Sequence, residues 1–185
     1  ADMKGENTMM TRREFIKVAG AGVLAVSCAG MLSGCDVVDS IKEELEDQGA
    51  AKATISNVTF MMETSAVQNS TGNGFIGYST LFHIRNKSSD TVKIPKEKIT
   101  AVIYDLAGNG YEMKYTGKDI EVEKDSGKVK IEDFALKTIA EVPSDSSLKS
   151  VKYKKAIITI AYKGKKAVFT DDDENGTITP KVENA

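Results

Sequence analysis

Hydrophobic residues recur at every second position through most of the chain after residue 53, and many of them are β-branched or aromatic. This period is typical of strands with one buried side and one solvent-facing side. The pattern predicts seven strands, at residues 54–63, 77–86, 99–105, 111–116, 128–136, 152–162 and 166–170. Polar turn sequences separate them, such as those at residues 69–74, 86–90 and 107–110. Short strands with regular turns and no strong helical pattern predict an all-β, antiparallel sandwich of about seven strands.

The alternation also predicts which side chains form the core. In the second strand, one side carries Tyr78, Thr80, Phe82 and Ile84, and the other carries Leu81, His83 and Arg85. The first set is the predicted core side, and Ile158, Ile160 and Tyr162 form the equivalent side of the sixth strand. The third strand is apolar on both sides, which indicates a central position in the sheet.

The first 34 residues have the three-part pattern of an export signal. A cationic stretch is followed by an apolar stretch at residues 18–32, rich in Ala and Gly. At about 15 residues, this stretch is shorter than the about 20 residues of a membrane-spanning helix. Small residues then precede Cys35, as they do at signal-peptide cleavage sites.

The cationic stretch reads Thr-Arg-Arg-Glu-Phe-Ile-Lys and resembles the twin-arginine export motif. The resemblance implies recognition by the twin-arginine translocase, which normally carries proteins that have already folded. The residues that match the motif are Arg12, Arg13, Phe15 and Lys17.

The sequence Leu32-Ser33-Gly34-Cys35 resembles the lipobox of bacterial lipoproteins. The resemblance implies that lipoprotein-processing enzymes cleave after Gly34 and attach a diacylglycerol to Cys35, which anchors the protein in membrane lipid. Cys28 is a competing site, but Ala25 stands where the lipobox prefers Leu. An uncleaved N-terminal anchor helix is a further alternative, and Met3, Met9 and Met10 are all candidate start residues.

The predicted organisation is a cleaved signal at residues 1–34, the lipidated Cys35 with an acidic linker at residues 35–52, and one domain at residues 53–185. Residues 37–45 of the linker have apolar positions at helical spacing, which is consistent with a short helix that either lifts the domain off the membrane or docks a partner. The two cysteines, Cys28 and Cys35, precede the domain, so the domain itself has no disulfide. The formal net charge of −2 gives no reason to expect nucleic acid as a partner.

Residues 81–111 resemble the immunoglobulin-like domains of uncharacterised secreted bacterial lipoproteins, the immunoprotective-extracellular-protein-like superfamily. The similarity rests on a strand that ends in Asn86-Lys-Ser, an extended crossing, and a strand that ends in Asp105 and a glycine turn. It implies an immunoglobulin-like β-sandwich with an extracytoplasmic binding role, and it carries over no catalytic residue.

The acidic sequence at residues 171–178 is the sharpest candidate for a metal site. It matches the first half of a calcium-binding EF-hand loop, in which hard oxygen ligands alternate along the chain. The match fails at the twelfth position, where Val182 replaces the expected Glu, and a solvated hairpin turn is the alternative interpretation. Otherwise no cofactor is expected. The candidate Ca²⁺ ligands are Asp171, Asp173, Asn175 and Thr177.

Catalysis is not expected. His83 is the only histidine, and no cysteine lies in the domain, so a zinc site or a catalytic triad has few candidate residues. Met61 and Met62 are adjacent and face opposite sides of a strand, which does not suit one copper ion. A pair of carboxylates for glycoside chemistry needs a cleft and usually aromatic platforms, but the chain has no Trp. The carboxylates considered for it are Asp105, Asp119, Glu121 and Glu123.

The sequence therefore favours a lipid-anchored, extracytoplasmic interaction module that binds an unknown envelope protein or wall polymer through its loops or an edge strand. A calcium- or small-ligand-handling lipoprotein is the alternative. Lysines gather around the last predicted hairpin, where they either contact anionic lipid or polymer or protect an edge strand. They are Lys152, Lys154, Lys155, Lys163, Lys165 and Lys166.

Overall fold

The computed structural model describes residues 49–69 and 73–185, which form an all-antiparallel β domain. The predicted all-β, antiparallel class is therefore confirmed. The strands are β1 Ala51–Ile55, β2 Val58–Asn69, β3 Ile76–Asn86, β4 Val92–Ile94, β5 Ile99–Tyr104, β6 Gly110–Tyr115, β7 Ile120–Val122, β8 Ser126–Lys130, β9 Ala135–Thr138, β10 Lys155–Tyr162, β11 Lys165–Asp172 and β12 Thr177–Asn184. Two 3₁₀ helices join them, η1 Lys96–Lys98 and η2 Ser147–Ser150.

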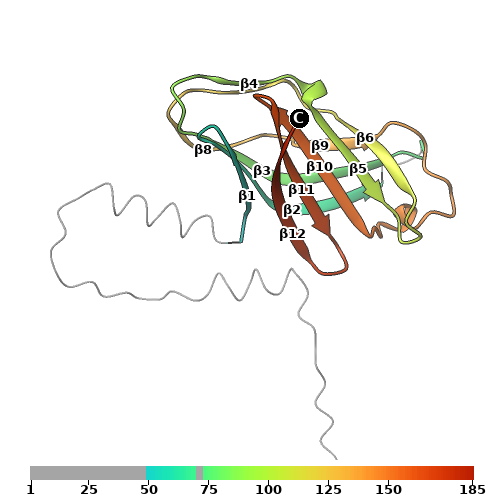
Figure 1. Ribbon diagram of the computed structural model, residues 1–185. Coiled ribbons are helices and arrows are strands. Elements are labelled where there is room, and N and C mark those ends of the chain that lie inside the picture. Colours follow the sequence, from blue (N-terminus) through green and yellow to red (C-terminus); the bar gives the residue numbers. More distant parts are fainter. Residues whose placement is uncertain (1–48, 70–72) are drawn as a thin grey trace, which may run out of the picture. The chain divides into compact units, whose positions relative to one another are not determined.

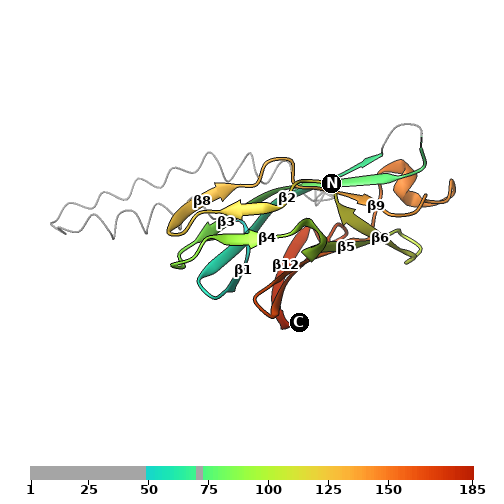
Figure 2. The same cartoon turned by 90° about the horizontal axis from the view of Figure 1, so that it is seen from above.

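The main sheet has the strand order β1-β2-β3-β9-β6-β5-β10-β11-β12, and β8 pairs with β3 beside β9. Its first and last strands contact each other, so the sheet is nearly closed and barrel-like (Figure 1). The short β4 and β7 form a separate two-stranded sheet. In Figure 2, β4 and β8 lie toward one end of the domain, and the orange segment that contains η2 lies toward the other.

The structure has twelve strands within the described residues where the pattern predicts about seven, because two predicted strands are each divided and three strands, β4, β7 and β12, were not predicted. The predicted strand at residues 54–63 spans β1 and β2, which are joined by a tight turn. Ser56 and Asn57 form that turn with φ values of 49° and 63°. Such hairpin turns usually contain glycine, and its absence hid this one. The predicted strand at residues 128–136 is broken between β8 and β9, where Asp133 has a φ of 53°.

The predicted C-terminal acidic loop and tail is also corrected, because most of it is the edge strand β12. This strand pairs with β11 over its full length, but its side chains are exposed except for Ile178, which is half-buried. Pro180 lies within it, as prolines in sheets usually do at edges. With so little burial, β12 lacks the alternating pattern that identifies a strand. At the other end, β1 begins at Ala51, two residues before the predicted domain boundary.

The core lies on the inner face of the main sheet, as the alternation predicts. Tyr78, Phe82 and Ile84 of β3 are buried, whereas Thr80, predicted on the same side, is half-buried. Leu81, His83 and Arg85 on the opposite face are only partly covered. The Phe82 ring stacks on Phe134 with centroids 4.4 Å apart and meets Phe169 edge-on. Each such pair stabilises the fold by about 0.5–1.5 kcal/mol beyond burial alone. The central position predicted for the third strand is confirmed, since β5 lies between β6 and β10.

Candidate functional site

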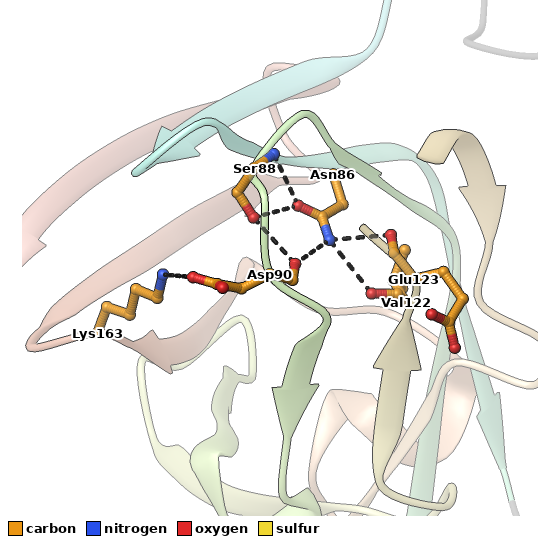
Figure 3. A network of polar contacts seen from close by, with 6 residues as sticks. All are labelled: Asn86, Ser88, Asp90, Val122, Glu123 and Lys163. Atoms are coloured by element: carbon orange, nitrogen blue, oxygen red, sulfur yellow. Dashed lines mark hydrogen bonds and ion pairs between the residues drawn. The ribbon is translucent and has the colours of Figure 1, made fainter. Parts of the chain in front are cut away.

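A buried asparagine fixes the crossing from the main sheet to the β4–β7 sheet (Figure 3). The Asn86 side chain is fully buried at the end of β3. Its amide nitrogen donates to the carbonyl oxygens of Asp90 (2.8 Å), Glu123 (2.9 Å) and Val122 (3.2 Å). Its oxygen accepts from the backbone N–H (3.0 Å) and the hydroxyl (2.6 Å) of Ser88. One side chain thereby holds the loop before β4 and the end of β7 together.

The strands β7 and β8 are joined by only three residues, yet they do not pair with each other in the structure. β7 pairs with β4, and β8 pairs with β3. Beyond them the two segments meet again, where Tyr115 of β6 pairs with Leu136 of β9 and Thr116 N–H donates to the Ala135 carbonyl (2.9 Å). The chain segments therefore diverge between two fixed junctions, and a groove opens between them.

This groove has a volume of about 590 Å³, within the range of about 300–1,000 Å³ that is usual for ligand sites. We call it the β7–β8 groove. Its apolar lining consists of the buried Tyr115 and Ile120 and the half-buried Val129 and Ile131. The charged residues that line it are Lys118, Asp119, Glu121, Lys130, Glu132 and Asp133.

A second hollow of about 570 Å³ adjoins the groove across Tyr115, Thr116 and Gly117, which line both. Its lining is more apolar than that of the groove and includes Ile99 and Met113. Ile139 also lines it, with 54% of its surface exposed. The two hollows together form an extended concave surface over the link between β6 and β7.

The Tyr115 ring is part of the lining of both hollows. It folds back over Gly117, and a Cβ atom at that position would overlap the tyrosine hydroxyl. Burial, and then the nearby Asp133 carboxylate, raise the pKa of Tyr115. The hydroxyl therefore stays protonated at neutral pH, where it can donate a hydrogen bond to a bound group.

The carboxylates considered for glycoside chemistry have structural contacts. Asp105 is buried and accepts hydrogen bonds from the backbone and side chain of Asn109 and from the Ser146 hydroxyl. Burial acts to raise the pKa of Asp105, but the hydrogen bonds outweigh it and lower the pKa below its ordinary value. Asp119 accepts from the backbone N–H of Lys96 at 2.9 Å.

The two remaining carboxylates of that set are engaged at the surface. Glu121 forms an ion pair with Lys93 at 3.4 Å, and Glu123 accepts from the Thr91 hydroxyl at 3.3 Å. Both contacts lie on the β4–β7 sheet or beside it, so, like the hydrogen bonds of Asn86, they link the β4 and β7 segments.

The candidate calcium ligands are divided between the core and the surface. Asp171 is fully buried, and its carboxylate accepts from the hydroxyls of Tyr153 (2.6 Å) and Tyr78 (2.9 Å). Asn175 donates through its side chain to Asp172 (2.7 Å), which closes the turn between β11 and β12. Asp173 and Thr177 are exposed. Within residues 49–69 and 73–185, no group of three His, Cys, Asp or Glu side chains is arranged to hold a metal ion. The calcium hypothesis stays a prediction.

The other residues singled out in the sequence lie apart from the groove. His83 is on the outer face of β3, as predicted, but only 14% of its side chain is exposed, and its Nδ1 lies 3.2 Å from the Glu63 carboxylate. Met61 lies beside His83, and Met62 lies beside Phe82, so these two methionines face opposite sides of β2. Met62 belongs to the core, as does Met113, the third methionine considered for a copper site.

The lysine cluster does not protect an edge strand, because β12 covers the edge of β11 on which Lys165 and Lys166 lie. Lys163 instead reaches Asp90 at 3.8 Å (Figure 3), and the Lys155 ammonium lies 4.9 Å from the centre of the Tyr104 ring. These contacts place Lys163 beside the loop before β4 and Lys155 beside β5.

The groove was not predicted as a site, although two of its lining residues, Asp119 and Glu121, were considered in the sequence as carboxylates for glycoside chemistry. The one sequence signal of the groove is a run of turns and short apolar segments between residues 116 and 134, and nothing in it shows that β7 and β8 remain unpaired. The export motif and the lipobox, Arg12 to Cys35, lie outside the described residues. In the part of the chain that is described, no helix has the length and apolar character to cross a membrane. Comparison with known protein families and with curated proteins found no match to this chain.

Proposed function

We propose that the protein is a lipid-anchored interaction module of the bacterial cell envelope, exported by the twin-arginine route and held in the membrane through acylated Cys35. The twin-arginine-like run and the lipobox-like sequence support this proposal, because they stand in the required order near the start of the chain. The partner is an envelope protein or a wall polymer, and the role is binding rather than catalysis.

The observation that carries the binding role is the β7–β8 groove with its adjoining hollow. The groove is large enough for a ligand, it combines an apolar floor with charged walls, and Asn86 fixes one of its walls. A fixed wall matters because a preformed site loses less conformational entropy on binding than a mobile one.

The immunoglobulin-like class is part of this proposal. It is supported by the antiparallel strands and by the crossing after Asn86, which leads through β4 to β5 and the turn held by Asp105. The nearly closed main sheet is a departure from a simple seven-stranded sandwich, and we propose that it is an elaboration of that fold.

The function is tested by cross-linking the tagged protein in its native cells and identifying what is recovered with it. Cys35→Ala is the control, since it removes the anchor and leaves the domain unchanged. The proposal predicts a partner that is lost with Cys35→Ala and that binds the purified domain directly. Recovery of the same proteins with and without the anchor, none of which binds the purified domain, would contradict it.

A further inference from the structure

The β7–β8 groove presents backbone groups as well as side chains. β8 pairs with β3 along one edge, and just past its end Ile131 N–H donates to the Phe82 carbonyl at 2.9 Å. In a strand, the N–H and C=O groups of successive residues face opposite edges. Those of Lys130 therefore point away from β3. Lys130 lines the groove, and no strand pairs with this edge of β8 within the described residues.

Exposed strand edges of this kind are templates for a further strand, because they hold a row of unused donors and acceptors. Proteins that bind extended peptides by strand addition use such an edge, and pockets beside it select alternate side chains. Here the apolar floor formed by Ile120, Val129 and Ile131 lies next to the edge. At the end of β8, Val129 and Lys130 line the groove, so a bound strand would pair with the backbone of Lys130 and the rest of an extended peptide would lie along the groove.

The charge of the groove selects among possible peptides. Four carboxylates line it, those of Asp119, Glu121, Glu132 and Asp133, against two lysines, Lys118 and Lys130, for a formal charge of −2. Two of these carboxylates already form exposed ion pairs, Glu132 with Lys130 at 3.1 Å and Glu121 with Lys93 at 3.4 Å, and such exposed pairs are weak enough for a basic partner to compete with them. An acidic groove attracts a basic partner and disfavours an acidic one. Tyr115 is the one aromatic residue in the groove lining and is 6% exposed, so there is little ring surface on which a sugar could stack.

We infer that the β7–β8 groove binds an extended, lysine- or arginine-bearing segment of a partner polypeptide, which adds as a strand to the free edge of β8. This inference rests on the proposed function and specifies the chemistry of its partner. Alternate side chains of the bound segment contact the apolar floor, and the others face the carboxylates on the groove walls.

The inference is tested with the chain from Asp36 onward, whose core lies wholly within residues 51–169. The probe is a capped hexapeptide of alternating lysine and valine, and binding is followed by the NMR shifts of backbone amides. We expect saturable shifts confined to residues 115–121 and 129–135. N-methylation of the valine amides removes peptide donors without changing charge, so it should weaken binding by about tenfold or more. An alternating glutamate–valine peptide should not bind.

Two sets of variants separate the backbone contribution from the charge. Lys130→Pro removes one donor at the free edge, and Lys130→Ala is its control because it removes the same charge and keeps the donor. We expect only the proline variant to lose binding by about tenfold. Glu132→Gln with Asp133→Asn should weaken binding and reduce its salt dependence. Their control is Glu174→Gln with Glu183→Gln, which removes two charges on the β11–β12 hairpin.

Absence of saturable shifts in the groove with the basic peptide would overturn the inference. Equal binding of the N-methylated peptide would overturn it as well, because attraction between charges alone would then explain the interaction. The N-methylated peptide tests the edge without altering the protein, so the inference can be refuted even if Lys130→Pro fails to fold. If a partner is captured through the groove in cells but no peptide binds, the inference of strand addition is refuted and the proposed function is still supported.

Discussion

Replacement of Asn86 tests whether one buried side chain holds the groove wall in place. Asn86→Ala removes three donated and two accepted hydrogen bonds. Since the amide has only two hydrogens, the three donated bonds share them, and the equivalent of about four full bonds is lost. At about 0.5–1.5 kcal/mol each, the free energy of unfolding should fall by roughly 2–6 kcal/mol. That is a large share of the about 5–15 kcal/mol that stabilises a typical domain.

Urea unfolding monitored by circular dichroism measures this loss, with Asn184→Ala on the exposed strand β12 as the matched control. The control should change the free energy of unfolding by less than about 0.5 kcal/mol. Amide exchange should also become faster at Ile120–Val122, because the carbonyl groups at the end of β7 lose their donor. A loss below about 1 kcal/mol for Asn86→Ala, with unchanged exchange in β7, would refute the reasoning.

The isosteric variant Asn86→Asp should have a stability that depends on pH, which tests the same hydrogen-bond network. Its carboxylate would face three carbonyl oxygens in a buried place, which raises its pKa above the ordinary value of about 3.9. A raised pKa in the folded state means that stability is greatest when the group is protonated and is lost as pH rises. We therefore expect Asn86→Asp to be less stable than Asn86→Ala at neutral pH, with the difference shrinking or reversing in acid. A difference between the two variants that does not change with pH would contradict this.

Three further predictions follow from other parts of the fold. Val151 is half-exposed and has a φ of 60°, which is strained for a β-branched residue. Val151→Gly should therefore raise the thermal midpoint by the equivalent of about 0.5–1 kcal/mol. A lowered midpoint would show that the contacts of the valine outweigh its strain. Burial, and then the charge of Asp171, raise the pKa of Tyr78, and burial, then its hydrogen bond to Asp171, raise that of Tyr153. Both should stay protonated as pH rises past the unfolded value of about 10, and the stability they contribute below that pH should be lost above it. Because the chain has six tyrosines, the phenolate absorbance is compared with that of a Tyr78→Phe, Tyr153→Phe variant; a difference between the two that appears near pH 10, before the circular dichroism changes, would contradict this. If the loop at residues 171–178 binds calcium, the melting midpoint should be higher in calcium than in chelator, and equal midpoints would discard the site.

The parts of the fold that the sequence predicted correctly are strands with one side in the core. In β10 every second residue is hydrophobic, and in β3 most are, because alternate side chains pack on the inner face of the sheet. Three strands, β4, β7 and β12, were not predicted. β12 buries almost nothing, and β4 and β7 have three residues each, too few to show a period.

The candidate site was harder to predict, because it depends on which strands fail to pair. Asn86 belongs to a motif that the sequence singled out, but its role requires β7, more than thirty residues later, to bring two carbonyl groups to its amide. The groove exists because β7 pairs with β4 rather than with β8. No local pattern in residues 116–134 encodes that choice. In contrast, the match of residues 171–178 to a calcium loop did not reveal that the Asp171 side chain is buried between two tyrosines.

The most direct test of the binding role is site-specific photo-cross-linking in the native cells. A photoreactive amino acid is placed at Thr116, an exposed residue that lines both hollows, and in a separate strain at Glu174 on the β11–β12 turn. Our account predicts a discrete cross-linked polypeptide from Thr116 that is absent from Glu174 and is lost with Cys35→Ala. Cross-links of the same pattern and yield from both positions, or none from Thr116 in cells that retain the anchored protein, would contradict the assignment of the groove as the binding site.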